Sequence, residues 1–456
     1  MIVSEKSYNY TDQRRESTTD IGPILDEGRW ARFGMWVTFL ASLAFLVDGL
    51  ALQVVSLSIP AIMRDWHVPR AAFANVVAIG YLGISIGTVC AGMLADRFGR
   101  RTMLLVSILV FDLATAAISQ VNGIPELIGL RFIDGLGLGG SIPIATSLIA
   151  EFTPTSLRSR AVNLGMVSIS IGGVSAGLLG ARILPGIGWR MLFLAIAVVT
   201  FAVLVLLLVC LPESPRYLVR NSASHARLRR ILNKLNVIAD PASQLVDTRR
   251  RTTGRNAFAE VFGRGAMFNT MLLWGAFFFC LMMTYIIVSW IPTVLAARGY
   301  DLTVTSSTSS LYGCGGIVGS LLCARFVETL GSRIMMSILA GFGAVIAASL
   351  SILPLGPQYN QIPMLGAILG LGLCIGGLTG CLYALAAHTY PPAVRASGIG
   401  AASGVGRIGG IVSPYVAALV LGLGGRTAFF QCVGVCSLCL LAFLLLVRSH
   451  IPARGA

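Results

Sequence analysis

Twelve apolar segments, each about long enough to cross a lipid bilayer, occupy most of this sequence and constrain its fold more than any other feature. A transmembrane helix needs about 20 consecutive apolar residues. The predicted spans are 34–58, 73–95, 102–120, 125–150, 161–184, 190–211, 268–292, 306–327, 333–354, 361–387, 395–422 and 427–447. Only 12% of the 456 residues are charged, whereas soluble domains carry about 25%. The sequence therefore predicts an all-α membrane protein.

A single long polar interval divides the twelve spans into six and six. The first 30 residues are polar and lack the apolar core and small-residue cleavage site of a signal peptide, so we expect a cytosolic tail. The predicted organisation is a cytosolic N-terminal tail (1–33), a six-helix bundle (34–211), a cytosolic central loop (212–266), a second six-helix bundle (267–448) and a short cytosolic tail (449–456).

The basic residues predict how the chain crosses the membrane. With the N-terminus in the cytosol, 26 of the 34 lysines and arginines fall on the cytosolic side and six on the other. Such an asymmetry sets the orientation of membrane proteins. The net charge of +15 is then mostly a feature of topology that faces anionic lipid and not nucleic acid. We expect a multi-pass protein of a bacterial inner membrane with both termini in the cytosol.

The central loop contains SHARLRRILNKL, in which leucine and isoleucine recur at helical spacing among basic residues. This pattern predicts a short amphipathic helix that lies on the inner leaflet. The alternative is a helix that docks a partner.

The sequence lacks the residues that several kinds of chemistry would need. All ten cysteines lie in apolar segments, where we expect small packing residues and neither disulfides nor a metal site. The chain lacks a G-x-x-x-x-G-K-[ST] phosphate loop, and no nucleophile or acid–base set gathers near a loop. The sequence therefore predicts no enzyme activity, no cofactor and no use of ATP within this polypeptide.

The two halves repeat their loop motifs. GMLADRFGRR follows the second span and ARFVETLGSR the eighth, and aligning Asp96 with Glu328 also aligns Arg101 with Arg333. A second pair, EFTPTSLRSRA and HTYPPAVRASG, follows the fourth and tenth spans. Parallel six-helix repeats around a site at the membrane midplane are an architecture of secondary transporters.

These motifs resemble the signatures of a known group of transporters. GMLADRFGRR and RFIDGLGLGG resemble the two signatures of the major facilitator superfamily, and PESPRYL resembles its sugar-porter and organic-acid branches. SWIPTVLAARGY and YPPAVRASGIGAASGVGRIGGIVSP resemble the aromatic acid:proton symporter family. The resemblance covers about residues 34–448 and implies twelve helices in two pseudo-symmetric six-helix bundles. That family carries D-G-x-D in span one, but the second aspartate is Ala51 here.

Two isolated charges inside predicted spans are the main functional candidates. Asp48 has no charged residue one helical turn away, and protonation removes the cost of burying an unpaired carboxylate. It is the candidate proton-coupling group; the alternative is a structural pair with an arginine of another helix. Arg407 lies among glycines of span eleven, and spans nine to twelve contain no acidic residue. It is the candidate ligand of a substrate carboxylate, or else a structural residue, and the resemblance implies a functional arginine at this position.

Further candidates are weighed against structural roles. Arg131 and Asp134 are three residues apart on one helix, which favours a local ion pair, although Arg131 also remains a substrate-binding candidate. Asp112 could join this pair. The remaining cavity candidates are polar or aromatic residues within spans: Gln53, Tyr285, Trp290 and Tyr383.

Charged residues at the cytosolic ends of the spans form a different set. The resemblance implies that they act as a gating network, whose charges pair and separate as the transporter alternates between two states. The alternative is simple anchoring by positive charge. The residues are Asp96, Arg97, Arg101, Glu151 and Arg158 in the first half, and Glu328, Arg333 and Arg395 in the second. Ser332 replaces Arg100 and His388 replaces Glu151 in the repeat, so we expect a weaker second network.

The sequence thus predicts a monomeric, proton-coupled symporter that imports a small organic anion, with a benzoate or hydroxybenzoate as the expected substrate. One alternative is the same fold acting as a sugar or metabolite transporter or as a proton-driven exporter. The other is a transporter-like receptor that binds its ligand without moving it.

Overall fold

The structure is a computed structural model that describes residues 18–20, 32–219, 225–234, 244–246, 267–390 and 395–453. Within these residues the chain is almost entirely helical. The two strands described are β1 (Thr18–Asp20) and β2 (Gln244–Val246), which pair in parallel.

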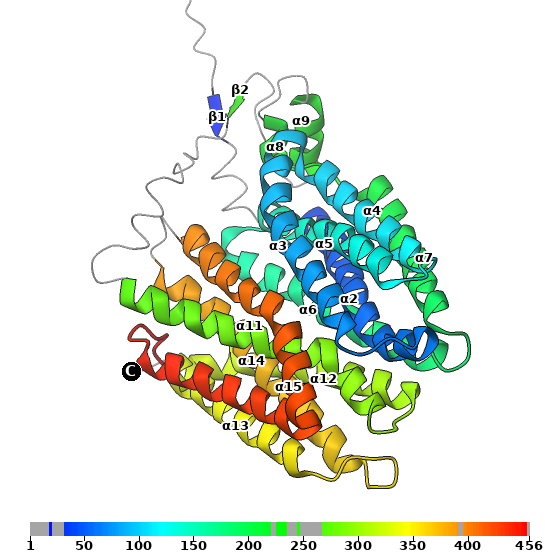
Figure 1. The fold of residues 1–456 in the computed structure, drawn as a ribbon. Coiled ribbons are helices and arrows are strands. Elements are labelled where there is room, and N and C mark those ends of the chain that lie inside the picture. The colour runs from blue at the N-terminus through cyan, green and yellow to red at the C-terminus, as the bar shows by residue number, and fades with distance from the viewer. Residues whose placement is uncertain are drawn as a thin grey trace, which may run out of the picture.

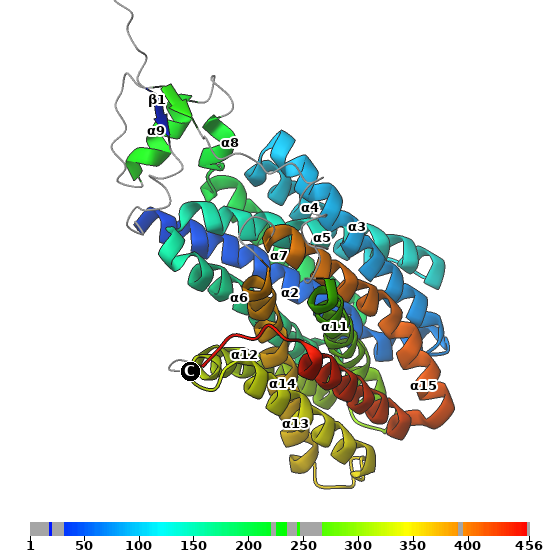
Figure 2. The same cartoon turned by 90° about the vertical axis from the view of Figure 1, so that its left-hand side faces the viewer.

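The helices form two groups that lie side by side (Figures 1 and 2). The first consists of α2 (Arg32–Trp66), α3 (Ala72–Phe98), α4 (Arg100–Ile118), α5 (Ile124–Phe152), α6 (Thr155–Ile183) and α7 (Trp189–Cys210). The second consists of α11 (Met267–Ala296), α12 (Leu302–Leu330), α13 (Ser332–Ile352), α14 (Ile362–Thr389) and α15 (Arg395–Leu446). The short helices α8 (Pro215–Val219) and α9 (His225–Lys234) lie at one end of the first group (Figure 1).

Eleven helices of the described residues are long and apolar enough to cross a membrane. The last of them, α15, contains both the eleventh and the twelfth predicted spans. It bends at Gly425, whose φ of +59° is outside the helical range. Gly425 falls between the eleventh and twelfth predicted spans. Each of the twelve spans is therefore found as a helical segment, and the predicted all-helical fold with two groups of spans is confirmed.

Each group has its own hydrophobic core, and the repeat seen in the sequence is also a repeat of packing. A Cβ at Gly135 of α5 would lie 2.3 Å from the carbonyl oxygen of Gly80 on α3. The repeat aligns this pair with Gly372 of α14 and Tyr312 of α12, where the corresponding distance is 2.1 Å. Only glycine permits such close approach of two backbones, so the same helix pairs cross in the same way in both halves.

The predicted amphipathic helix is present as α9, but its apolar side is covered by protein. Leu228 and Leu232 are fully buried in the hydrophobic core of the first bundle, which also contains Leu218 of α8. Because these side chains pack against the protein, they are not available to insert into a leaflet. The prediction of a helix whose apolar face lies on the membrane is therefore wrong.

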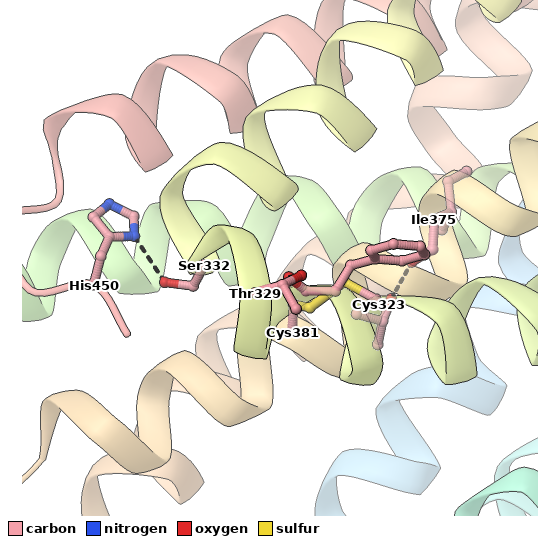
Figure 3. Close-up of a disulfide and its surroundings, with 8 residues drawn as sticks. Cys323, Thr329, Ser332, Ile375, Cys381 and His450 are labelled. Carbon is pink, nitrogen blue, oxygen red and sulfur yellow. Dashed lines mark hydrogen bonds between the residues drawn. A yellow bond between two sulfur atoms is a disulfide. The ribbon is translucent and has the colours of Figure 1, made fainter. Parts of the chain in front are cut away.

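The expectation that no disulfide forms is also wrong. Cys323 of α12 and Cys381 of α14 form a disulfide, shown in Figure 3. The two cysteines are 58 residues apart in the sequence and become neighbours only because α12 and α14 pack closely. The other eight cysteines are free.

Candidate functional site

Two terms locate the site along the bundles. The linker end carries Gly99, residues 211–219 and Gly331, and the distal end carries residues 67–71, 184–188 and 297–301, which join helices at the other end. The candidate site lies between these ends, where the two bundles face each other.

Asp48 is fully buried in the first bundle and bonds to a hydroxyl group, not to an arginine. Its Oδ2 accepts a hydrogen bond of 2.6 Å from the Ser141 hydroxyl of α5. Its Oδ1 has no hydrogen-bond partner among the described residues. A buried carboxylate with one neutral donor is costly as an anion, and taking up a proton removes that cost. This setting is therefore suited to reversible protonation.

The local ion pair expected on α5 is formed. Arg131 and Asp134 are both buried and bonded to each other, and Asp134 also accepts a 3.2 Å hydrogen bond from the Thr115 hydroxyl of α4. The guanidinium of Arg131 lies over Gly80 of α3. Asp112 is buried one turn from Thr115, and its Oδ1 has no hydrogen-bond partner in the described part of the chain. Asp134 is close enough to Asp48 for the two carboxylates to interact electrostatically.

Arg407 of α15 reaches across to the other bundle. Its Nη1 donates to the Thr88 hydroxyl and, at 3.2 Å, to the Ile84 carbonyl oxygen, both on α3. Within the residues that the structure describes, no carboxylate forms an ion pair with Arg407. Its guanidinium thus rests on neutral acceptors, although its bidentate geometry suits a carboxylate better.

Three tyrosines lie near these charges. The rings of Tyr81 on α3 and Tyr285 on α11 are 4.3 Å apart at their centroids, and the Tyr81 hydroxyl lies 2.8 Å from the Ser289 hydroxyl. Tyr383 of α14 packs edge-on to Phe277 of α11 at 5.1 Å. The side chain of Tyr383 is 37% exposed although it lies within a span, so it borders open space inside or beside the bundles.

These residues lie near one another. Arg407 is within electrostatic range of both Tyr285 and Tyr383, and Arg131 is within range of Tyr81. We call this group the central cluster: Arg131, Tyr81, Tyr285, Tyr383 and Arg407.

The central cluster contains four of the six candidate substrate ligands. Asp48 lies close to Asp134, which pairs with Arg131 of the cluster. The two remaining candidates show no described contact with the cluster. Gln53 is buried on α2, and Trp290 is fully buried in the core of the second bundle, with no described partner for its Nε1. The sequence pattern did not single out Thr88, Ser141 or Ser289, because hydroxyl residues are common in spans and nothing in their spacing marks them.

A second polar group lies at the linker end of the first bundle. Glu151 of α5 forms an ion pair with Arg100 of α4 and accepts a hydrogen bond from the Ser214 hydroxyl, which follows α7. Arg101 donates from its backbone nitrogen to Glu213 at 2.9 Å. The corner formed by α4, α5 and the segment after α7 is thus held by charge within one bundle. Arg100, which pairs with Glu151, was not among the gating candidates.

The other gating candidates are more scattered. Arg97 is exposed, with its guanidinium 5.4 Å from the centroid of the Phe98 ring. Glu328 lies 4.0 Å from Arg325 on the same helix. The side chains of Asp96 and Arg395 fall outside the description, and Arg158 is partly buried.

The corresponding corner of the second bundle is held by the C-terminal segment. The Ser332 hydroxyl accepts a 2.8 Å hydrogen bond from the Ile451 amide and lies 3.1 Å from His450 Nδ1 (Figure 3). Arg333 donates to the Leu445 carbonyl, as Arg101 donates to that of Leu208 in the first bundle. A hydroxyl and an imidazole therefore take the place of the ion pair at this corner, and the weaker second network expected from the sequence stays a prediction.

Direct contacts between the bundles lie at mid-depth or toward the distal end. The Ser310 hydroxyl of α12 donates to the Val174 carbonyl of α6 at 2.9 Å, and Gly177 of α6 faces the same serine. Ala74, near the start of α3, is part of the core of the second bundle. Every inter-bundle hydrogen bond found between described residues lies in this region or involves Arg407. The distal side is therefore the closed side.

The described residues contain no group of three or more histidine, cysteine, aspartate or glutamate side chains that could hold a metal ion.

Comparisons with known proteins identify the type of molecule. The sequence profile of the Major Facilitator Superfamily matches residues 41–414. The chain is 30% identical over 391 residues to the 4-hydroxybenzoate transporter PcaK of Pseudomonas aeruginosa, which covers 85% of this chain and 86% of that protein. It is 29% identical over 441 residues to the gallate transporter of Pseudomonas putida, which covers 96% of this chain and 97% of that protein.

Among solved structures, the xylose transporter XylE from Escherichia coli in a partially occluded, inward-open conformation is similar. The TM-score is 0.73 and the sequence identity 17%, with 93% of this chain and 99% of that chain covered. At this identity the likeness concerns the fold. The proteins to which this chain is similar are transporters and not enzymes.

Proposed function

Because the chain belongs to the Major Facilitator Superfamily, we propose that it is a proton-coupled symporter that imports a small aromatic carboxylate of the benzoate or hydroxybenzoate class. The relatives named for 4-hydroxybenzoate, gallate and benzoate support this substrate class. Proton coupling is supported by the setting of Asp48 in the first bundle. The protein acts as a monomer in the bacterial inner membrane.

The observation that carries the proposal is the position of Arg407 in the central cluster. Its guanidinium lies at the inter-bundle face and bonds to neutral acceptors, so it can take a carboxylate without first leaving a carboxylate partner. Tyr285 and Tyr383 lie beside it and offer ring faces and edges to an aromatic ring. A benzoate bound in this way would place its charge on Arg407 and its ring among the tyrosines.

Asp48 supplies the proton site of the proposed mechanism. In the deprotonated state its charge faces, among the described residues, the Ser141 hydroxyl and the nearby negative charge of Asp134. Binding of a proton from the outer side neutralises Asp48 and lowers the cost of keeping it buried. Proton entry down the membrane potential yields about 2.3 kcal/mol per charge per 100 mV, which can drive uptake of the acid.

The linker end is the cytosolic side in this proposal, as the distribution of basic residues indicates. Closure of the distal side then corresponds to an inward-facing state that releases substrate and proton to the cytosol. The corner around Glu151 holds α4, α5 and the segment after α7 together as one body, and its charges contribute to gating when the first bundle turns against the second.

The test is uptake into proteoliposomes under an imposed inward proton gradient. We expect accumulation of 4-hydroxybenzoate, benzoate or gallate but not of xylose, and we expect Arg407→Lys to abolish most of the uptake. Lysine retains the charge but not the two-pronged geometry. Uptake of xylose without uptake of any aromatic acid would instead favour a sugar transporter. Saturable binding without accumulation would point to a receptor.

A further inference from the structure

Thr88 of α3 connects three helices at the inter-bundle face. Its hydroxyl oxygen accepts a hydrogen bond from Arg407 of α15. The same hydroxyl lies 2.9 Å from the Gly139 carbonyl of α5 and 2.7 Å from the Ile84 carbonyl of its own helix. A hydroxyl has one proton and two lone pairs, so Thr88 can donate to one of these carbonyls while it accepts from Arg407.

The packing of α3 against α5 fixes the position of the Thr88 hydroxyl independently of Arg407. A Cβ at Gly139 would lie 2.1 Å from the Ile84 carbonyl oxygen, so only glycine allows the two helices to come this close. The close approach brings the Gly139 carbonyl within reach of Thr88. The hydroxyl of Thr88 is thereby oriented with its acceptor side free for a donor from the second bundle.

We infer that Thr88 and the Ile84 carbonyl form a docking site for the Arg407 guanidinium in the empty transporter, and that the substrate carboxylate takes Arg407 away from it. This inference rests on the proposed function. Both docking partners are neutral, whereas hydrogen bonds between a guanidinium and a carboxylate are charge-assisted and about twice as strong. The docked state holds Arg407 in place across the bundle interface without preventing its transfer to an anion.

Thr88 is a positioning residue in this account, since it acts on the substrate only through Arg407. Docking and the substrate compete for the same guanidinium. Because only undocked Arg407 can bind the substrate carboxylate, the apparent affinity for the substrate is the intrinsic affinity multiplied by the undocked fraction. Weakening the dock therefore increases substrate affinity, while strengthening it decreases affinity. A residue that bound the substrate itself would show the opposite response to loss of its hydroxyl.

The experiment compares Thr88→Val, Thr88→Asp and Thr88→Ser by equilibrium binding of 4-hydroxybenzoate to the purified protein. Thr88→Val removes a hydrogen bond to a charged group and should lower Kd by about tenfold. Thr88→Asp gives Arg407 a carboxylate partner and should raise Kd by more than about a hundredfold. Thr88→Ser keeps the hydroxyl and should bind like the unmodified protein. Thermal unfolding of each variant shows whether the bond to Gly139 matters for folding, and if Thr88→Val does not fold, Thr88→Asp still tests the inference.

Each outcome has a distinct meaning. If the unmodified protein binds no aromatic acid, the proposed function fails irrespective of Thr88. If it binds 4-hydroxybenzoate and Arg407→Lys weakens binding, but Thr88→Val leaves Kd unchanged or raises it, the docking inference alone is refuted. An unchanged Kd in a folded Thr88→Asp variant refutes it as well.

Discussion

Gly177 offers the sharpest test of how the two bundles close. It lies on α6 of the first bundle, where that helix crosses α12 of the second near the distal end. A Cβ at this position would lie 2.1 Å from the Ser310 hydroxyl oxygen, 2.8 Å from the Ser306 carbonyl oxygen and 3.1 Å from the Ser310 amide nitrogen. Two of these atoms belong to the backbone, so a rotamer change alone cannot relieve the overlap.

The substitution Gly177→Ala should therefore destabilise the distal-closed state. Overpacking by one methyl group costs about 1–3 kcal/mol. Because α6 and α12 belong to different bundles, the overlap vanishes when the distal side opens, and the cost falls on one conformation only. Since 1.4 kcal/mol is about a factor of ten, the population should shift toward the distal-open state by about 5- to 150-fold.

The matched control is Gly173→Ala, one turn away on the same helix, where a Cβ would have no neighbour within 4 Å. The population shift can be measured as the distance between spin labels at Ile187 and Tyr359, two exposed positions on the distal side of the two bundles. The eight free cysteines must be replaced before labelling. A longer distance in Gly177→Ala than in Gly173→Ala is the expected result. Equal distance distributions in the two variants would refute this account of the closed side.

Three further predictions concern stability. Gly135→Ala should lower the thermal unfolding temperature, because its Cβ would lie 2.3 Å from a backbone oxygen, whereas Gly129→Ala on the same helix meets nothing within 4 Å and should be neutral. Glu151→Gln should cost about 1–3 kcal/mol of unfolding free energy, since Arg100 loses its buried partner; an unchanged denaturant midpoint would contradict the described corner. Burial lowers the pKa of His450, so the folded state binds fewer protons there than the unfolded state. The attachment of the C-terminal segment should be complete above about pH 6.5 and weaken as the pH falls through the lowered pKa. Amide exchange in residues 448–453 would detect this weakening. The substitution His450→Gln should remove the pH dependence.

Much of the fold could be predicted because the bilayer restricts the possibilities. Apolar segments of about 20 residues have to be helices in lipid, and the repeated motifs showed that the chain contains two similar halves. Helix α15 was expected as two spans, and the structure shows both as helical segments on either side of the kink at Gly425.

Contacts between distant residues were harder to predict. The pairing of Cys323 with Cys381 depends on the close packing of α12 and α14, and neither residue has a local signal. The buried apolar face of α9 depends on its contact with α8, since the same leucine pattern suits either protein or lipid.

The sequence singles out the charged residues of the candidate site but not its neutral residues. Asp48 and Arg407 are conspicuous because an ionisable group is costly in a span. Thr88 and Ser141 are not conspicuous, because hydroxyl groups in helices commonly bond to their own backbone. Only the arrangement of α2, α3, α5 and α15 shows that Thr88 contacts Arg407 and that Ser141 contacts Asp48.

The central claim is that Asp48 carries the proton and that its protonation is coupled to movement of the anion. The most direct measurement compares net uptake of 4-hydroxybenzoate driven by a proton gradient with exchange of labelled for unlabelled substrate at equal pH, using Asp48→Asn in proteoliposomes. Asparagine mimics the protonated form, so we predict that exchange continues while accumulation against a gradient is lost. Accumulation by Asp48→Asn equal to that of the unmodified protein would contradict the claim.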